Sequence, residues 1–249
     1  MELSTTPKVE PDQVRCAIRF RSGEWRATIF RDLVVNEIRR AGHTASVLDI
    51  GCGHGFDGDK ELQDQIGREA CQFIGVEPDP DIEVNGRFGV VHRHILEESP
   101  IRAESIDVAY ATMVLEHLSR PAVFFDTVER ILRPGGVFWG FTVDRRHYFC
   151  AGSRFLESIQ LKDAYLNWFG GRRGVERYEN YPTYYRCNSP SQLAGLTRKF
   201  SSVSVFSLSR PGQIQSYVPR PFRPLINVLD WITDLCELPG HVLVLRCQK

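Results

Sequence analysis

The feature that most constrains this chain is an apolar run at 47–50, followed by a loop with a glycine at every second position. The run is short and closed by glycines, so it predicts a buried strand. Gly51, Gly53 and Gly55 allow the backbone to approach a ligand closely and to take angles that other residues avoid. A helix that starts after such a loop offers free N–H groups and a partial positive charge. The stretch therefore predicts a ligand-binding turn between a strand and a helix.

Strands and helices alternate along the rest of the chain. Further strands are predicted at 71–77, 89–94, 106–112, 137–143, 201–208 and 241–246. Helical spacing of apolar residues predicts helices at 24–41, 120–132, 190–199 and 225–238. Such alternation predicts a doubly wound α/β fold, with a mainly parallel sheet covered on both faces. The apolar stripe of the helix at 225–238 predicts packing on the sheet or a homodimer contact.

Composition bounds the class of protein. The 249 residues, with 31 basic and 31 acidic side chains and a net charge of +0, suit one large domain or two small ones. This balance gives no surface-wide field for nucleic acid, so no nucleic-acid partner is expected. Apolar stretches such as 108–115 are much shorter than a membrane span requires. The seven cysteines form no C-x-x-C pair, so no metal site is expected. The first residues lack a signal-peptide pattern, and we expect a cytoplasmic protein.

An acid follows the second predicted strand. Glu77 lies where a carboxylate can bind both hydroxyls of a ribose. Two ligands compete for the loop and this acid. Residues 53–58 match the dinucleotide fingerprint G-x-G-x-x-G, which would make the chain a nicotinamide-dependent oxidoreductase. The turn begins at Gly51, however, and a count from there puts Phe56 at the third glycine position.

The charges near the loop favour the other ligand. A pyrophosphate would meet Asp57 and Asp59 at the start of the helix, and like charges repel. A cofactor with an amino-acid end and no phosphate fits better, because Asp49 can pair with its ammonium group. This combination favours S-adenosylmethionine, which becomes S-adenosylhomocysteine when it has given up its methyl group.

Several motifs together resemble a known family. They are VLDIGCGHG at 47–55, GVEPD at 75–79, IDVAYATMVLEHL at 106–118 and LRPGGVFWGFTV at 132–143. In order and spacing they resemble the motif set of class I S-adenosylmethionine-dependent methyltransferases, in a bacterial subgroup that acts on small molecules. The resemblance implies a Rossmann-like seven-stranded sheet of order 3-2-1-4-5-7-6, whose last strand is antiparallel, with an insertion after strand 5. We expect a single domain over 1–249, made of a helical cap (1–42), a cofactor-binding core (43–143), a substrate or lid insertion (144–188) and the rest of the sheet (189–249).

The resemblance also implies which residues bind the cofactor. Asp49, Gly51, Cys52 and Gly53 would contact its methionine half, Glu77 would hold the ribose, and Thr112 and Met113 would line the wall beneath the methionine portion. Many family members bind the adenine amine through an acid after the third strand, where this chain has His94-Ile95-Leu96-Glu97. Either Glu97 takes that role, or adenine is held by backbone groups and by packing at Ile95.

Methyl transfer needs positioning and a dry site, and it needs a base only when the methyl acceptor arrives protonated, as a hydroxyl does. His147 follows the fifth strand and is our predicted base, because imidazole titrates near neutral pH. A structural role is the alternative. Glu116 and His117 follow the fourth strand in a stretch that resembles ubiquinone-pathway O-methyltransferases. Those enzymes add a metal-ligating glutamate where this chain has Met113. The pair is either a hydrogen-bonded loop pair or part of a metal or catalytic site.

The insertion at 144–188 is rich in aromatic residues and arginines. They are Tyr165, Trp168, Phe169, Tyr178, Tyr181, Arg172, Arg173 and Arg177, with the predicted substrate contacts Tyr148, Tyr184, Tyr185 and Arg186. Such side chains can form a lid that stacks on a ring and pairs with an acidic group, or a small core under a long loop. We predict methylation of a small-molecule acceptor at oxygen. Nitrogen or carbon acceptors and a nicotinamide-dependent oxidoreductase are the alternatives.

Overall fold

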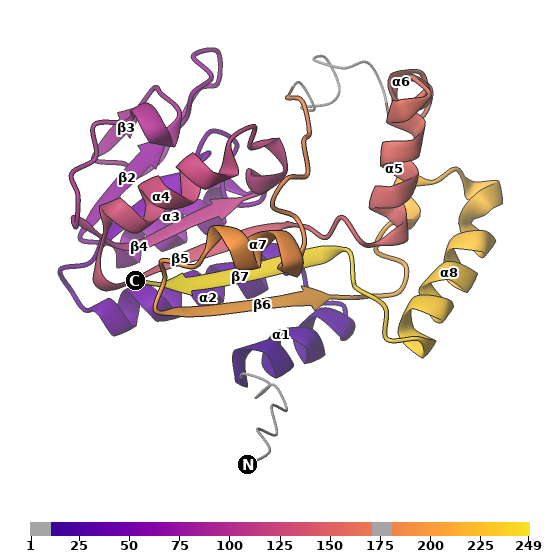
Figure 1. Ribbon diagram of the computed structural model, residues 1–249, viewed down its shortest axis with the longest axis horizontal. Coiled ribbons are helices and arrows are strands. Elements are labelled where there is room, and N and C mark those ends of the chain that lie inside the picture. The colour runs from indigo at the N-terminus through magenta and orange to yellow at the C-terminus, as the bar shows by residue number, and fades with distance from the viewer. Residues whose placement is uncertain (1–10, 171–180) are drawn as a thin grey trace.

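The computed structural model describes residues 11–170 and 181–249, and Figure 1 shows their arrangement. Seven strands form one sheet in the order β3-β2-β1-β4-β5-β7-β6. They are β1 (Ser46–Ile50), β2 (Gln72–Val76), β3 (Val90–His92), β4 (Ile106–Thr112), β5 (Leu132–Val143), β6 (Ser202–Leu208) and β7 (Val242–Gln248). Strands β1 to β5 pair in parallel, and β7 runs antiparallel to both of its neighbours. The predicted fold class and strand order are confirmed.

Helices cover both faces of this sheet. The α-helices are α1 (Pro11–Arg21), α2 (Arg26–Ala41), α3 (Lys60–Glu69), α4 (Pro121–Ile131), α5 (Tyr148–Ser158), α6 (Lys162–Gly170), α7 (Pro190–Leu196) and α8 (Arg223–Leu235). Short 3-10 turns are η1 (Leu96–Glu98), η2 (Leu115–His117), η3 (Gln215–Tyr217) and η4 (Arg220–Phe222). Helices α1, α2 and α3 share one core with Trp139 and Phe141, while α4 and α7 share the other with Phe138. Neighbouring residues of β5 thus face opposite cores, as a strand covered on both sides requires.

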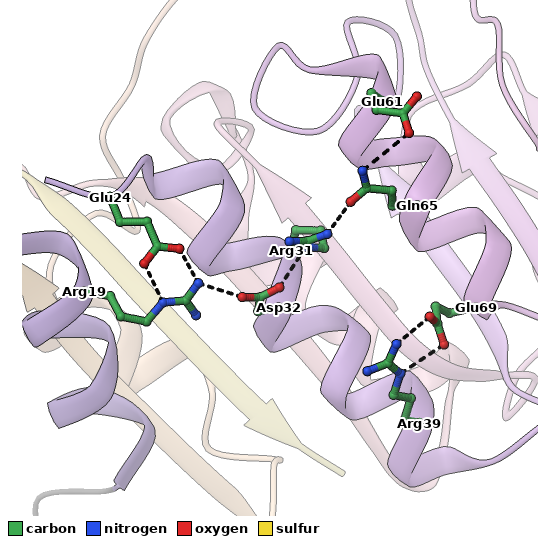
Figure 2. A network of polar contacts seen from close by, with 8 residues as sticks. All are labelled: Arg19, Glu24, Arg31, Asp32, Arg39, Glu61, Gln65 and Glu69. Atoms are coloured by element: carbon green, nitrogen blue, oxygen red, sulfur yellow. Dashed lines mark hydrogen bonds and ion pairs between the residues drawn. The ribbon is translucent and has the colours of Figure 1, made fainter.

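Charged side chains connect the N-terminal helices to α3 (Figure 2). Arg19 of α1 binds both Glu24 and Asp32, the latter at 2.6 Å. Arg39 of α2 pairs with Glu69 of α3 at 2.7 Å. A surface groove of about 290 Å³ lies between α2 and α3, and Asp32, Arg39 and Glu69 are among the residues that line it. Pairs so close to solvent contribute little stability, so the network orients helices that the buried core holds in place.

Strand β5 begins earlier than predicted. We expected the segment 134–136, Pro-Gly-Gly, to turn the chain into a strand at 137, but the strand starts at Leu132. Its pairing with β4 changes register between Ile106 and Val108, so a bulge absorbs the extra residues. Gly135 has a φ of +81°, which glycine adopts without steric strain.

Helix α8 contradicts one of the two predicted alternatives, that its apolar stripe packs on the sheet, and leaves the homodimer contact as a prediction. Figure 1 shows α8 beyond the ends of the strands, away from the centre of the sheet. Its buried residues are Ile226, Asp230 and Thr233, while Leu225 and Val228 of the predicted stripe are exposed. Within the two described ranges, no helix combines the length and the apolar character that crossing a membrane requires.

Candidate active site

The loop after β1 forms a narrow cradle at the carboxyl end of the sheet. Gly51 has a φ of +80°, and a Cβ at this position would lie 2.5 Å from Cγ2 of Val114. At Gly53 a Cβ would lie 2.6 Å from Oε2 of Glu77 and 2.5 Å from Cγ2 of Ile82. Neither position has room for a side chain, so the backbone itself lines the cradle and can approach a ligand closely.

Glu77 lies directly against this loop. It follows β2 and is buried. Its Oε2 accepts a hydrogen bond from the N–H of Gly53 at 3.0 Å, and its Oε1 accepts one from the N–H of Asp79 at 3.0 Å. The fold therefore brings the predicted ribose-binding acid and the glycine loop together. Backbone donors fix the orientation of both carboxylate oxygens.

Asp49 lies beneath the loop and is buried. Its Oδ2 accepts hydrogen bonds from the Tyr110 hydroxyl at 2.8 Å and from the Gln63 amide at 2.7 Å. Gln63 also donates to the carbonyl oxygen of Cys52 at 2.8 Å. Burial raises the pKa of Asp49 to about 7, because the two hydrogen bonds offset only part of the desolvation. Asp49 and Gln63 thus support the loop from inside the protein.

The end of β4 lies beside the cradle. Met113 has a φ of +55°, a strained angle for a residue with a side chain, and its N–H donates to the oxygen of Phe141 at 2.8 Å. The hydroxyl of Thr112 is buried and has no hydrogen-bond partner in the described part of the chain. Ile95 is the half-buried residue that precedes η1, after β3. Because parallel strands end at one edge, the predicted cofactor residues lie at neighbouring strand ends.

Residues 181–188, which we call the strap, cross the same edge. The N–H of Tyr184 donates to the oxygen of Glu116, beyond β4, at 2.8 Å. The hydroxyl of Tyr181 donates to the carboxylate of Asp79, beyond β2. In the sheet β1 lies between β2 and β4, so the strap spans the strand end that carries the glycine loop.

The predicted substrate residues of the strap have different surroundings. Tyr184 is exposed, and the guanidinium of Arg186 lies 5.2 Å from the centre of its ring. Arg186 also donates to the oxygen of Ser119 at 2.5 Å. Tyr185 is half-buried with a φ of +51°, and burial raises the pKa of its hydroxyl to about 12. Of these three residues, Tyr185 is the one turned toward the interior. Tyr178, Arg172, Arg173 and Arg177 lie outside the described residues.

His147 is the N-cap of α5. It is buried, and its Nδ1 accepts a hydrogen bond from the N–H of Phe149 at 3.2 Å. Burial lowers its pKa to about 4, although the charges of Asp230 and Asp144 act in the opposite direction. A neutral ring whose Nδ1 accepts a hydrogen bond carries its proton on Nε2, so this geometry leaves no free lone pair for the proton of a hydroxyl. The hydroxyl of Tyr148, a predicted substrate contact, donates to Asp230 at 2.6 Å.

A small cavity of about 10 Å³ lies next to this residue. His147, Arg210, Asp230 and His241 are among its lining residues. Nδ1 of His241 is buried and has no partner in the described ranges, and burial lowers the pKa of this histidine to about 3. A cavity of this size has room for about one water molecule. A ring-sized methyl acceptor does not fit there.

Glu116 is buried between the ends of β4 and β5. Its Oε2 accepts a hydrogen bond from the Thr142 hydroxyl at 2.8 Å, and that hydroxyl accepts one from the Asn188 amide at 2.8 Å. Burial raises the pKa of Glu116, and the charge of His117 opposes this rise. Nδ1 of His117 lies 3.1 Å from the oxygen of Pro182. Both residues thus hydrogen-bond within the loops, and no group of three potential metal ligands occurs in the described chain.

The sheet order, the glycine cradle and Glu77 define a class I S-adenosylmethionine-dependent methyltransferase. The chain belongs to the methyltransferase domain family, whose model matches residues 20–185. It is 26% identical over 226 residues to the ubiquinone biosynthesis O-methyltransferase of Methylobacterium nodulans, which covers 79% of this chain and 86% of that one. Four further enzymes with that name match as well, and this chain spans only 52% to 59% of their length.

Solved structures of methyltransferases share this fold. A SAM-dependent methyltransferase from Archaeoglobus fulgidus has a TM-score of 0.53 and 16% identity, with 93% of this chain and 97% of that chain covered. The plantazolicin methyltransferase, solved with a monoazolic desmethylPZN analogue and S-adenosylhomocysteine, has a TM-score of 0.53 and 15% identity, with 96% of this chain and 90% of that chain covered. At such low identity these likenesses concern the fold.

S-adenosylmethionine is the cofactor, and the residues present fit it. The cradle at Gly51 and Gly53 is one that a Cβ would fill, and Glu77 presents an oriented carboxylate. The alternative of a nicotinamide-dependent oxidoreductase is set aside. Sequence reasoning missed Tyr110 and Gln63. The one usable signal was Tyr110, whose hydroxyl lies among the apolar residues 108–111 of β4. The structure pairs Tyr110 in register with Asp49.

Proposed function

We propose that this enzyme transfers the methyl group of S-adenosylmethionine to a hydroxyl oxygen of a small-molecule acceptor. The cofactor supplies a methyl group on a positively charged sulfur, so the protein needs mainly to position the acceptor and to exclude water. The observation that carries the proposal is the strap, which brings the inward-turned Tyr185 to the edge that holds the cradle. The O-methyltransferase relative from Methylobacterium nodulans supports oxygen as the methylated atom.

In this proposal the strap also covers the cofactor. The bond from Tyr181 to Asp79 links the strap to the loop after β2, and the N–H of Asp79 is bound by Glu77. The ribose-binding acid and the strap anchor are thus joined through one residue. A closed strap would exclude water from the sulfur, whereas an open one would let the cofactor exchange.

The surroundings of His147 bear on the kind of hydroxyl. With a pKa of about 4 and an Nδ1 used by the cap, its imidazole is a weak base in this geometry. A phenol, with a pKa of about 10, loses its proton far more readily than an alcohol. We therefore expect a phenolic hydroxyl, which a tyrosine such as Tyr185 can also contact through its ring.

Paired substitutions at His147 separate its two roles. His147→Ala removes both the cap and the imidazole, whereas His147→Asn keeps a good capping residue and removes the base. A catalytic base would make both variants lose at least about 100-fold in kcat. If the residue acts as a cap, the asparagine variant keeps its activity within a few-fold and only the alanine variant lowers the Tm. We expect this second result.

The proposal itself is tested with S-adenosylmethionine labelled in the methyl group and a panel of small phenols, alcohols and amines. Label on a phenolic oxygen supports the proposal. Label only on nitrogen or carbon acceptors would overturn it. A Gly53→Val variant serves as the control, because a side chain at this position would meet Glu77 and fill the cradle.

A further inference from the structure

Helix α8 presents a narrow apolar stripe to solvent. Leu225, Val228, Ile232 and Leu235 are all exposed, with values of 57%, 52%, 36% and 64%. Their spacing of three, four and three residues is that of the a and d positions in a heptad repeat. In other proteins this pattern faces a second helix.

The opposite face of α8 attaches the helix to its own chain, mainly through polar contacts. Asp230 accepts hydrogen bonds from the Tyr148 hydroxyl at 2.6 Å and from the N–H of Gly212 at 2.7 Å. Ile226 is the one apolar residue among the three buried ones of the helix. An isolated helix of 13 residues is only marginally stable in water unless an apolar face is packed. We therefore expect another helix to cover the exposed stripe.

The apolar surface extends to both sides of the stripe. Phe222 and Trp231 are exposed at the flanking e and g positions, and Leu238 follows the helix. With the stripe, these side chains expose roughly 700 Å² of apolar surface, taking about 200 Å² for each side chain of this size. A stable interface takes about 800 Å² from each partner, and a patch this large on a monomer commonly marks an interaction site.

We propose that this face binds α8 of a second copy of the chain, in an antiparallel pair around a two-fold axis. The stripe is centred on position 230, so Leu225 of one copy falls opposite Leu235 of the other, and Val228 falls opposite Ile232. The stripe therefore matches a second copy of itself, with an apolar residue opposite each apolar residue. Arg223 shares the face of Asp230 and lies away from this seam.

The charges of α8 argue against a lipid surface as the occupant. Helices that lie on anionic membranes carry mostly lysine and arginine on the polar face. Here the end of the helix is acidic, with Asp234 and Glu237, and Asp234 pairs with Arg21 at 2.9 Å. Asp230 of α8 accepts a hydrogen bond from Tyr148 of α5, the helix that His147 caps. A dimer that fixes α8 would therefore also stabilise the position of α5.

The mass of the full chain in solution tests the proposal. We expect sedimentation analysis to find twice the monomer mass of 28.5 kDa. Val228→Asp should weaken the dimer about 100-fold or more, because it would bury an unpaired charge in the seam. Val123→Asp is the matched control, since this exposed valine of α4 lies outside the interface. Both variants should bind S-adenosylhomocysteine, which shows that they fold.

Three results would overturn the proposal. The first is a wild type that stays monomeric throughout a concentration series, and the second is a Val228→Asp variant that stays dimeric. The third is a monomer that floats with phosphatidylglycerol vesicles through an intact Val228, which would make the face a membrane surface. The antiparallel pairing has its own test. Leu225→Lys and Leu235→Glu should each weaken the dimer several-fold, and the double variant should regain part of it, because positions 225 and 235 face each other in this pairing. A double variant that regains nothing refutes the antiparallel pairing.

Discussion

Replacing Asp49 by asparagine should stabilise the protein at alkaline pH. The pKa of about 7 lies roughly three units above the ordinary value of 3.8, because the carboxylate is buried. Between pH 4 and 7 the folded protein holds a proton that the unfolded chain has lost, so stability falls as the pH rises. At about 1.36 kcal/mol per unit, the ionised carboxylate lowers the free energy of unfolding by about 4 kcal/mol at pH 8. Asparagine keeps a carbonyl oxygen for Tyr110 and Gln63 and does not ionise.

Urea denaturation at pH 4 and pH 8 measures this effect. The Asp49→Asn variant should be about 2–4 kcal/mol more stable than the wild type at pH 8, and within about 1 kcal/mol of it at pH 4. Tyr110→Phe is the matched control. It removes a donor to the ionised carboxylate, so it should destabilise at pH 8 by about 1–3 kcal/mol. If the difference between wild type and Asp49→Asn does not change with pH, the reasoning about burial is refuted.

Three further substitutions test the edge of the sheet. Gly53→Ala should weaken S-adenosylhomocysteine binding roughly tenfold to hundredfold by calorimetry, because the new Cβ displaces Glu77, the predicted ribose-binding acid; unchanged affinity would contradict the cradle. Tyr181→Phe loses the hydrogen bond to Asp79, so the cofactor should dissociate roughly fivefold faster in stopped flow. An unchanged rate would show that the strap does not control cofactor exchange. Thr142→Val removes the hydroxyl that donates to the Glu116 carboxylate. This substitution should lower the free energy of unfolding, measured in urea, by about 1–3 kcal/mol. An unchanged free energy would mean that water replaces the hydroxyl.

The cradle could be predicted because local signals agree with the global fold, whereas the strand order was predicted from the resemblance to the family. Gly51 and Gly53 occur where only glycine fits, and the strand that precedes them places Val47 in one core and Leu48 and Ile50 in the other. Asp49 shows where such reasoning stops. Its sequence position indicates an acid near the ligand, but its hydrogen bond to Tyr110 depends on the register between β1 and β4. One sequence without its pairing partners contains no measure of that register.

Helix α8 shows a second limit. Periodicity correctly indicates which side chains share a face, here Leu225, Val228 and Ile232. It contains no information on what covers that face, because the sheet and a second helix both bury an apolar stripe. The deciding contacts are polar ones from Asp230 to Tyr148 and to Gly212, which are far apart in the sequence.

Three of the six non-glycine residues with a positive φ in the described ranges lie at the edge that we propose for the cofactor and the methyl acceptor. Asp57, Met113 and Tyr185 all have positive φ angles although they carry side chains. Each is held by its surroundings: Asp57 by an ion pair with Arg26 at 2.6 Å, Met113 by its bond to the end of β5, and Tyr185 by its N–H to Glu116. Such angles cost about 1–3 kcal/mol each and persist where the surrounding structure enforces them. These three lie at the cradle, at the end of β4 and in the strap, whereas Glu104, Gln160 and Glu237, which also have positive φ, lie in turns elsewhere. Changes that relax Met113 or Tyr185 should therefore disturb the parts that the proposed reaction requires.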